Sequence, residues 1–290
     1  MKSKILCIVA IKGGFGNQLF QYNFADYMRN QGFNVKIDNS FYKTTVNDPG
    51  VTNREQVLES DLFDFKEISK LENFVLKILK RVNSSNKAPK FRKFIKNKLF
   101  KYFKEKNFNL ESGLPKIIYC DGYWQDLKFI QNDAIYIRES LKKISVINKA
   151  LLKKADKDSY MIIVRRGDYI KMKQELGIEY YQDCFKFINK NSPAAKVNIF
   201  TDDIRWVNNQ KLFNNVNSIH GPEDSPEGVL NLFARMLENK HFFIGNSTLS
   251  FFAALVGRVS DSKIYVADPW FRNKATKNLI FEDWIRVKNV

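Results

Sequence analysis

The feature that most constrains the fold is a glycine turn near the N-terminus. An apolar run at 5–11 leads into the turn at 13–16, and a segment with apolar residues at helical spacing follows it as far as Gly32. A glycine at that position is typical of the left-handed residue that ends a helix. The run at 33–38 then alternates like a second strand. Because parallel strands need a crossover helix, this order predicts an α/β fold on a parallel sheet.

The same turn is a candidate ligand site. Glycines let a backbone approach a ligand closely, and a helix N-terminus facing such a turn favours a phosphate or a sugar oxygen. Asn17 is expected to cap the helix, and neither Asn17 nor Gln18 has a packing explanation. The turn lacks both the P-loop signature and the three-glycine dinucleotide spacing. An ordinary strand-to-helix turn therefore remains the alternative.

The composition limits the kinds of site. The three cysteines lie far apart without a CxxC pair, which is typical of a reducing compartment. With His220 and His241 as the only histidines, a structural zinc site is not expected. No apolar run reaches the roughly 18 residues of a spanning helix, and the N-terminal run ends without a signal-peptide cleavage site. We therefore expect a cytoplasmic protein.

The charge is uneven. The formal net charge is +17, and residues 66–106 hold fourteen Lys or Arg against three Glu. Apolar residues at helical spacing interleave with these cations, which predicts two basic amphipathic helices around a break at 83–86. Such a face suits an anionic membrane surface or another polyanion, and a solvated face over an ordinary core is the alternative. Charge alone permits nucleic acid, but no recognised nucleic-acid-binding motif is present, and no nucleic-acid partner is expected.

The second half begins the strand–helix alternation again. A buried type of strand at 160–164 is followed by Arg165, Arg166 and Asp168. Ligands of open α/β sheets bind at the carboxyl ends of strands, and an anionic ligand would satisfy two adjacent arginines with bidentate hydrogen bonds. An internal salt-bridge cluster with Asp168 is the alternative.

Two further strands of this half, at 197–200 and 242–244, end in polar residues. These residues are Asp202, Asp203, Asn246, Ser247 and Ser250. The two carboxylates are suited to capping the next helix or to accepting hydrogen bonds from a base or ribose. The amide and hydroxyls lie at a helix N-terminus, which is a second anion-binding arrangement, with plain capping as the alternative.

The charged stretch at 153–158 is the expected boundary between a domain at 1–155 and a domain at 156–290. Two α/β halves facing a cleft suit a transferase with a nucleotide-sugar donor. The departing diphosphate would be stabilised by Arg165, Arg166 and the helix N-terminus at Ser247. A metal would otherwise do this, but the sequence shows no convincing carboxylate motif for one.

Four motifs, in this order, resemble those of the bacterial α-1,2-fucosyltransferases of glycosyltransferase family 11. They are GGFGNQLFQY at 13–22, RRGDY at 165–169, FTDD at 200–203 and NSTLS at 246–250. Residues 122–125 and 180–181 are also similar, and the resemblance spans roughly residues 5 to 271.

The resemblance implies a GT-B type fold, with two Rossmann-like parallel-sheet domains facing a cleft. Residues 1–155 would be the acceptor side with a basic helical insertion, and residues 156–290 would bind the GDP-sugar. It also implies a metal-independent, inverting galactoside α-1,2-fucosyltransferase with no cofactor and GDP-fucose as donor. The acceptor would be a galactoside on an oligosaccharide or lipid-linked glycan, in O-antigen, capsule or other surface glycan synthesis. The location would be the cytoplasm, peripheral on the inner membrane face.

The resemblance also implies roles for particular residues. Arg165 and Arg166 would hold the diphosphate, and Asp202 or Asp203 would read the guanine. The residues implied to bind phosphate oxygens are Asn246, Ser247 and Ser250. The residues implied to line the fucose and diphosphate from the first half are Gly14, Gly16, Asn17 and Gln18. Asp168 is a candidate general base, together with Asp26 and Asp38.

The sequence departs from the family pattern before the first arginine, where Ile163 stands in place of the usual histidine. Phe251 and Phe252 replace the usual tryptophans. The isoleucine leaves another GDP-deoxyhexose open as donor. A non-catalytic module that binds a polyanion or a membrane is the alternative from another class.

Overall fold

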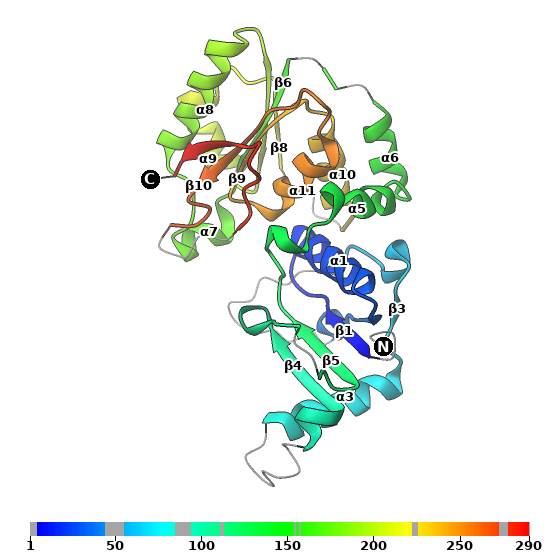
Figure 1. The fold of residues 1–290 in the computed structure, drawn as a ribbon. Helices are drawn as coiled ribbons and strands as arrows, with labels where there is room; N and C mark the ends of the chain where they lie inside the picture. Colours follow the sequence, from blue (N-terminus) through cyan, green and yellow to red (C-terminus); the bar gives the residue numbers. More distant parts are fainter. Residues whose placement is uncertain are drawn as a thin grey trace. The chain divides into compact units, whose positions relative to one another are not determined.

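The computed structural model describes residues 5–43, 55–84, 94–110, 113–153, 155–156, 158–221, 226–272 and 278–289 (Figure 1). The chain divides into two compact units. The N-terminal unit comprises Met1–Trp124 with Phe129–Gln131, and the C-terminal unit comprises Gln125–Lys128 with Asn132–Val290.

The N-terminal unit is built on a parallel five-stranded sheet in the order β3-β2-β1-β5-β4. Its strands are β1 (Leu6–Ala10), β2 (Asn34–Asp38), β3 (Lys66–Glu67), β4 (Phe100–Lys104) and β5 (Ile117–Asp121). Its helices are α1 (Phe15–Asn30), α2 (Ser40–Lys43), α3 (Lys70–Ser84) and a π-helix at Ile95–Leu99, with 3-10 turns at Ser60–Phe63 and Glu105–Asn107. The predicted opening strand, helix and strand are thus present.

The C-terminal unit is built on a parallel six-stranded sheet in the order β11-β10-β9-β6-β7-β8. Its strands are β6 (Ser159–Val164), β7 (Lys196–Thr201), β8 (Ser218–His220), β9 (His241–Gly245), β10 (Ile264–Asp268) and β11 (Ile285–Lys288). Its helices are α5 (Ile135–Leu141), α6 (Ser145–Leu152), α7 (Gly167–Met172), α8 (Ile178–Asn191), α9 (Ile204–Asn208), α10 (Pro226–Leu237) and α11 (Thr248–Gly257). Three short 3-10 turns lie at Leu127–Phe129, Asn132–Ala134 and Lys211–Phe213.

The core of the C-terminal unit explains why its central strands are almost wholly apolar. Every residue of β6 and of β9 is buried, as expected for strands covered on both faces. Helix α8 packs on one face, where Tyr181, Cys184 and Ile188 join the side chains of β6, β7 and β10 in one cluster. Helices α10 and α11 pack together away from α8 (Figure 1). The predicted α/β class with two Rossmann-like parallel-sheet units is confirmed.

The division of the chain differs from the predicted one. The boundary lies around residues 124–132, not at 155/156. Residues 135–152 form α5 and α6, and these helices pack against α11 and α10 of the C-terminal unit. The charged stretch at 153–158 therefore belongs to the C-terminal unit, and its described residues lie between α6 and β6. Its composition resembles that of a linker because both kinds of segment are exposed.

The basic stretch also differs from the prediction. The first predicted amphipathic helix is present as α3. The second is predicted partly at 85–93, outside the described residues, and the described part after it forms the π-helix and the strand β4. Phe100 and Phe103 of β4 are buried, and the strand pairs with β5 at the edge of the sheet. Part of the predicted break at 83–86 lies outside the described residues. Among the described helices, none is both long and apolar enough to cross a bilayer.

Candidate active site

The polar residues predicted in the second half meet at one edge of the C-terminal sheet. Strands β9, β6 and β7 are neighbours, and all run in the same direction. Their carboxyl ends carry Asn246 and Ser247, then Arg165 and Arg166, then Asp202 and Asp203. Strand order, which the sequence does not state, therefore places the three motifs side by side.

Arg165 is held between two carboxylates. Its Nη2 lies 2.6 Å from Asp168 Oδ1, and its Nη1 lies 2.7 Å from Asp202 Oδ2. Asp168 lies in the first turn of α7, and 24% of the Arg165 side chain is exposed. Arg165 is thus part of an internal salt-bridge cluster with Asp168, which is the alternative to a ligand-binding role.

Arg166 is fixed by its backbone and its side chain. Its N–H donates to Asp202 Oδ1 at 2.7 Å, and its Nε donates to Asp203 Oδ2 at 3.2 Å. Its guanidinium also lies 4.1 Å from the centroid of the Trp206 ring. Asp203 in turn caps α9, because its Oδ1 accepts the Trp206 N–H at 2.9 Å. Capping, the alternative use of this carboxylate pair, is therefore found for Asp203 and not for Asp202.

The electrostatics of this cluster follow from its composition. Two guanidinium groups face three carboxylates, which leaves one net negative charge. A diphosphate would have to compete with these carboxylates for guanidinium N–H groups. Each guanidinium has five N–H donors, so an arginine can hold a carboxylate and a phosphate together.

Asn246 and Gln174 form an anchored amide pair beside this cluster. The Asn246 Nδ2 donates to the Gln174 carbonyl at 2.8 Å, and the Gln174 Nε2 donates to the Arg272 carbonyl at 3.0 Å. These bonds orient both amides and leave Asn246 Oδ1 and Gln174 Oε1 buried without a partner among the described residues. An unpaired buried acceptor costs roughly 1–3 kcal/mol, which a hydroxyl or amine donor would recover. No sequence motif identified Gln174.

The two serines of the β9–α11 turn behave differently. Ser247 occupies the N-cap position of α11, but its side chain makes no capping hydrogen bond. Ser250 is fully buried, and its hydroxyl donates to the Ile244 carbonyl at 2.7 Å. Ser250 therefore stabilises the turn, which argues against the predicted direct contact with phosphate. Ser247 remains at the helix N-terminus as predicted.

Ile163 lies in the strand core beneath this edge. It is 5% exposed, and its Cγ2 lies 3.0 Å from the position that a Cβ on Gly245 would take. Gly245 has φ +56°, a conformation that favours glycine. The isoleucine thus packs under the turn that carries Asn246.

In the N-terminal unit, the glycine turn has the predicted form with a different cap. Gly13 has φ +82°, and Gly14 is the N-cap of α1. Asn17 therefore lies inside the first helical turn and is not the cap, which corrects the prediction. A Cβ on Gly13 would lie 3.0 Å from Asn17 Nδ2 and 3.1 Å from Tyr123 Cε1, so this position requires glycine for space as well. Gly16 is buried in the same helical turn.

Gln18 joins the glycine turn to the segment 55–58 by hydrogen bonds. It is 0% exposed, and its Nε2 donates to the carbonyls of Gly13 at 3.2 Å and Glu55 at 3.1 Å. Its Oε1 accepts the N–H groups of Val57 at 3.2 Å and Leu58 at 3.1 Å. All its hydrogen-bonding capacity is used inside the unit. These bonds give Gln18 a structural role, and its role in lining the donor sugar stays a prediction.

A second polar cluster lies at the carboxyl edge of the N-terminal sheet. Asp121 binds Lys12 at 2.5 Å and accepts a hydrogen bond from Tyr102. Burial would raise the pKa of Asp121, but the hydrogen bonds from Lys12 and Tyr102 outweigh it and hold this pKa below its usual value. Asp38 accepts the Tyr119 hydroxyl at 2.8 Å. Asp38 thus has a hydrogen-bond partner, as Asp168 has an ion-pair partner.

The third candidate general base, Asp26, forms an ion pair with Arg29 at 2.6 Å on the side of α1. Because all three candidate carboxylates are paired, their contacts do not single out one of them. Among the described residues, no group of three or more His, Cys, Asp or Glu side chains could hold a metal ion.

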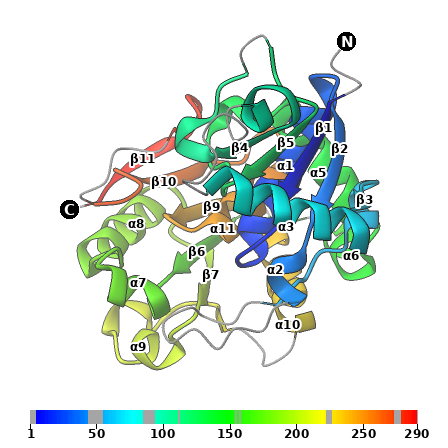
Figure 2. The same cartoon turned by 90° about the horizontal axis from the view of Figure 1, so that it is seen from below.

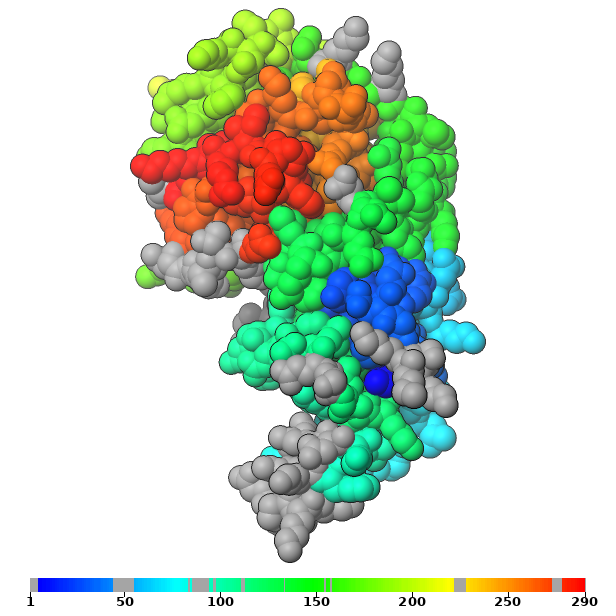
Figure 3. All heavy atoms as spheres, viewed as in Figure 1, coloured from blue at the N-terminus to red at the C-terminus, as the bar shows by residue number. Residues whose placement is uncertain are grey.

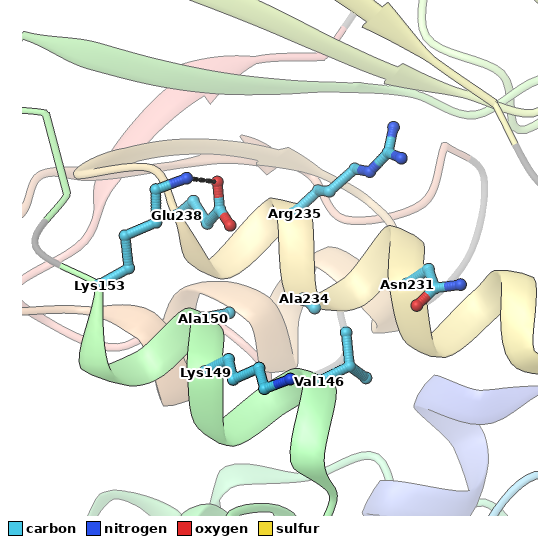
Figure 4. A pocket seen from close by; sticks show the side chains of 8 residues that line it. All are labelled: Val146, Lys149, Ala150, Lys153, Asn231, Ala234, Arg235 and Glu238. Atoms are coloured by element: carbon cyan, nitrogen blue, oxygen red, sulfur yellow. Dashed lines mark hydrogen bonds and ion pairs between the residues drawn. The ribbon is translucent and has the colours of Figure 1, made fainter.

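Two hollows lie in the C-terminal unit away from this edge. One, of about 420 Å³, lies between α6 and α10 and is bordered by the Lys153–Glu238 ion pair (Figure 4). The other, of about 700 Å³, adjoins it and is lined by residues near the amino ends of β6, β7 and β8. None of the predicted site residues lines either hollow.

The chain thus has two parallel-sheet α/β units, and polar residues gather at the carboxyl edge of the C-terminal sheet. The family model described as Glycosyl transferase family 11 matches residues 6–287. The chain belongs to glycosyl transferase family 11. A curated relative, the O-antigen biosynthesis glycosyltransferase WbnK of Escherichia coli, is 23% identical over 306 residues, covering 96% of this chain and 99% of WbnK.

Solved structures with a similar fold include fucosyltransferases. The NodZ α-1,6-fucosyltransferase of Bradyrhizobium, soaked with GDP-fucose, is 13% identical with a TM-score of 0.45, covering 87% of this chain and 92% of NodZ. A mutant of Arabidopsis thaliana FUT1 in complex with GDP is 9% identical with a TM-score of 0.47, covering 90% of this chain and 70% of that one. Neither TM-score reaches 0.5, so the function rests on the family and on the residues of the site.

Proposed function

We propose that the chain is an inverting galactoside α-1,2-fucosyltransferase, which moves L-fucose from GDP-fucose to the 2-hydroxyl of a galactoside. The observation that carries this proposal is the meeting of three family-like motifs at the ends of β9, β6 and β7. The chain is a family 11 glycosyltransferase, and its motif resemblance supplies the donor and the linkage. The reaction would serve surface glycan synthesis, with the protein in the cytoplasm.

The leaving GDP needs positive charge at its diphosphate. Arg165 and Arg166 provide it, and the N-terminus of α11 at Ser247 adds uncapped backbone dipoles aimed at the same edge. Because Asp168 and Asp202 already bind Arg165, donor binding exchanges some carboxylate contacts for phosphate contacts. Stabilising the leaving group in this way needs no metal, so we propose metal-independent transfer.

The sugar and base need directional contacts. Asp203, 29% exposed, is the more accessible of the two carboxylates proposed to read the guanine, since Asp202 is 16% exposed. The unpaired oxygens of Asn246 and Gln174 are suited to accept hydrogen bonds from hydroxyls of the donor. The acceptor hydroxyl must lose a proton to a general base, for which we propose Asp168, the candidate that is paired with Arg165.

A second donor is favoured by one observation. Ile163 fills the position where the family usually has histidine, and it is buried against Gly245. The site therefore lacks one polar contact to the donor, and another GDP-deoxyhexose is the second candidate.

Thermal unfolding in the presence of GDP, UDP or ADP tests the donor class. A ligand at about 100 times its Kd stabilises the native protein by roughly 2.7 kcal/mol, which is a measurable shift. We expect a shift with GDP that EDTA does not change, and its loss in Arg165→Ala and Arg166→Ala. Equal shifts with all three nucleotides, or none with any, would contradict the assignment.

A further inference from the structure

Helix α3 of the N-terminal unit has apolar residues on two different sides. On the inner side, Leu76 and Leu79 are 1% and 7% exposed and pack in one cluster with Ile8 and Ala10 of β1. The helix lies across the sheet on the side that faces the viewer in Figure 2. This contact accounts for the fold of α3 and for its attachment to the sheet.

The outer side of α3 is not explained by the fold. Leu71, Phe74, Val75 and Ile78 follow the spacing i, i+3, i+4, i+7, so they form one strip along the helix. They are 72%, 61%, 42% and 45% exposed. The segment around α3, cyan in Figure 3, contributes to the surface of the N-terminal unit. Four large apolar side chains exposed side by side on one helix mark an interaction surface.

Cations border this strip. Three exposed cations lie beside Phe74 on the helix, at i−4, i+3 and i+7 from it. They are Lys70, Lys77 and Arg81. The acidic residue of α3, Glu72, is turned elsewhere, since its Oε1 lies 2.5 Å from Lys36 Nζ. The hydrogen bond from Lys36 also lowers the pKa of Glu72, which keeps this carboxylate charged and paired. The strip therefore carries an apolar centre with a basic border, and the acidic residue of α3 pairs with Lys36 instead.

We propose that this face of α3 docks on the surface of an anionic lipid bilayer, with the helix lying in the plane of the membrane. Leu71, Phe74, Val75 and Ile78 would enter the boundary between headgroups and acyl chains, and the cations would reach the lipid phosphates. Residues 66–106, with fourteen Lys or Arg against three Glu, add long-range attraction to such a surface.

The shape of the face favours a bilayer over a protein partner. A strip four side chains long on one convex helix is far smaller than the roughly 800 Å² that each partner buries in a standard protein interface. A bilayer needs no complementary shape, because lipids rearrange around the inserted side chains. Docking by α3 does not depend on the donor or on the reaction. With a lipid-linked acceptor, it would hold the enzyme where its substrate is.

Flotation with lipid vesicles tests the proposal on the full chain. Vesicles of phosphatidylcholine alone are compared with vesicles that also contain phosphatidylglycerol. The central pair of variants is Leu71→Ser and Leu152→Ser, two leucines that are 72% and 78% exposed, the second in the C-terminal unit. We expect binding to the anionic vesicles, about tenfold weaker in Leu71→Ser (about 1.4 kcal/mol) and unchanged in Leu152→Ser.

A second pair tests the charge. Lys77→Gln should weaken binding to the anionic vesicles about fivefold, and Lys190→Gln, an exposed lysine of α8, should not. Absence of binding by the wild-type chain would overturn the proposal. Equal losses in Leu71→Ser and Leu152→Ser would also overturn it. A self-association that Leu71→Ser abolishes, with vesicle binding unchanged, would assign the face to a second copy instead. The GDP-dependent thermal shift, which reports folding and the donor site, should be the same in all four variants.

Discussion

Replacing Gln18 by methionine tests whether this residue of the 13–22 motif has a structural role or binds the donor. Methionine has nearly the same volume and keeps the packing, but it cannot form the four hydrogen bonds of Gln18. These bonds join the glycine turn at Gly13 to the segment 55–58, so their loss should destabilise the N-terminal unit without removing a ligand contact.

The magnitude follows from the number of bonds. Each neutral hydrogen bond contributes about 1 kcal/mol net, and the bond to the exposed Glu55 contributes less, so about 3 kcal/mol should be lost. For a unit of this size, that corresponds to a melting temperature lower by roughly 10 °C. Gln21 provides a graded comparison, because it is equally buried but has two hydrogen bonds, from the Lys12 N–H and to the Gly122 carbonyl. Gln21→Met should cost about half as much.

Thermal unfolding followed by circular dichroism measures the loss, and hydrogen exchange at residues 55–58 locates it. At temperatures where the variant is folded, Gln18→Met should retain most of its turnover. A variant that melts like the wild type but no longer transfers sugar would refute the reasoning and return Gln18 to the donor site.

Four further predictions concern the C-terminal unit and the reaction. Arg166→Ala should abolish transfer in assays that still show a folded protein, since it removes the guanidinium proposed to hold the diphosphate and keeps the backbone bond to Asp202. Asp168→Asn should strengthen GDP binding about two- to fivefold by releasing Arg165, as measured by calorimetry, yet lower turnover. EDTA should leave the transfer rate unchanged. Burial, Lys240 and Lys263 lower the pKa of His241 from 6.5 to about 4. As the pH drops from 6.5 to 4, the unfolded chain therefore binds a proton at His241 before the folded chain does, and the free energy of unfolding falls. Urea titrations should show that this fall in the free energy of unfolding is smaller by roughly 1–3 kcal/mol in His241→Asn.

The sequence predicted the parts of the site that depend on strand ends. A buried run followed by polar residues marks the carboxyl end of a parallel strand, and Arg165, Asp202 and Asn246 all lie at such ends. Sequence order alone could not show that β9, β6 and β7 are neighbours, because strand order depends on long-range pairing. Gln174 could not be predicted either, because its role comes from long-range contacts with Asn246 and Arg272.

The structure differs from the sequence-based expectation at Gln18, at Ser250 and in α3, and these differences share a physical cause. Gln18 looked free to bind a ligand because its partners lie at 55–58, in a stretch that reads as an ordinary loop. Ser250 was predicted to bind phosphate because it lies in the first turn of a helix. The first turn exposes some side chains and buries others, and the sequence does not show that Ser250 is on the buried side. In α3, helical spacing predicted apolar faces but could not show that only one of them meets the sheet.

The most direct test of the central claim is a transfer assay with radiolabelled GDP-fucose, with GDP-mannose as the matched donor and a set of galactosides as acceptors. We expect fucose transfer in the presence of EDTA, a product with an α-1,2 linkage to galactose, and no transfer in Arg165→Ala. Transfer from GDP-mannose alone, or a fucosylated product with another linkage, would contradict it.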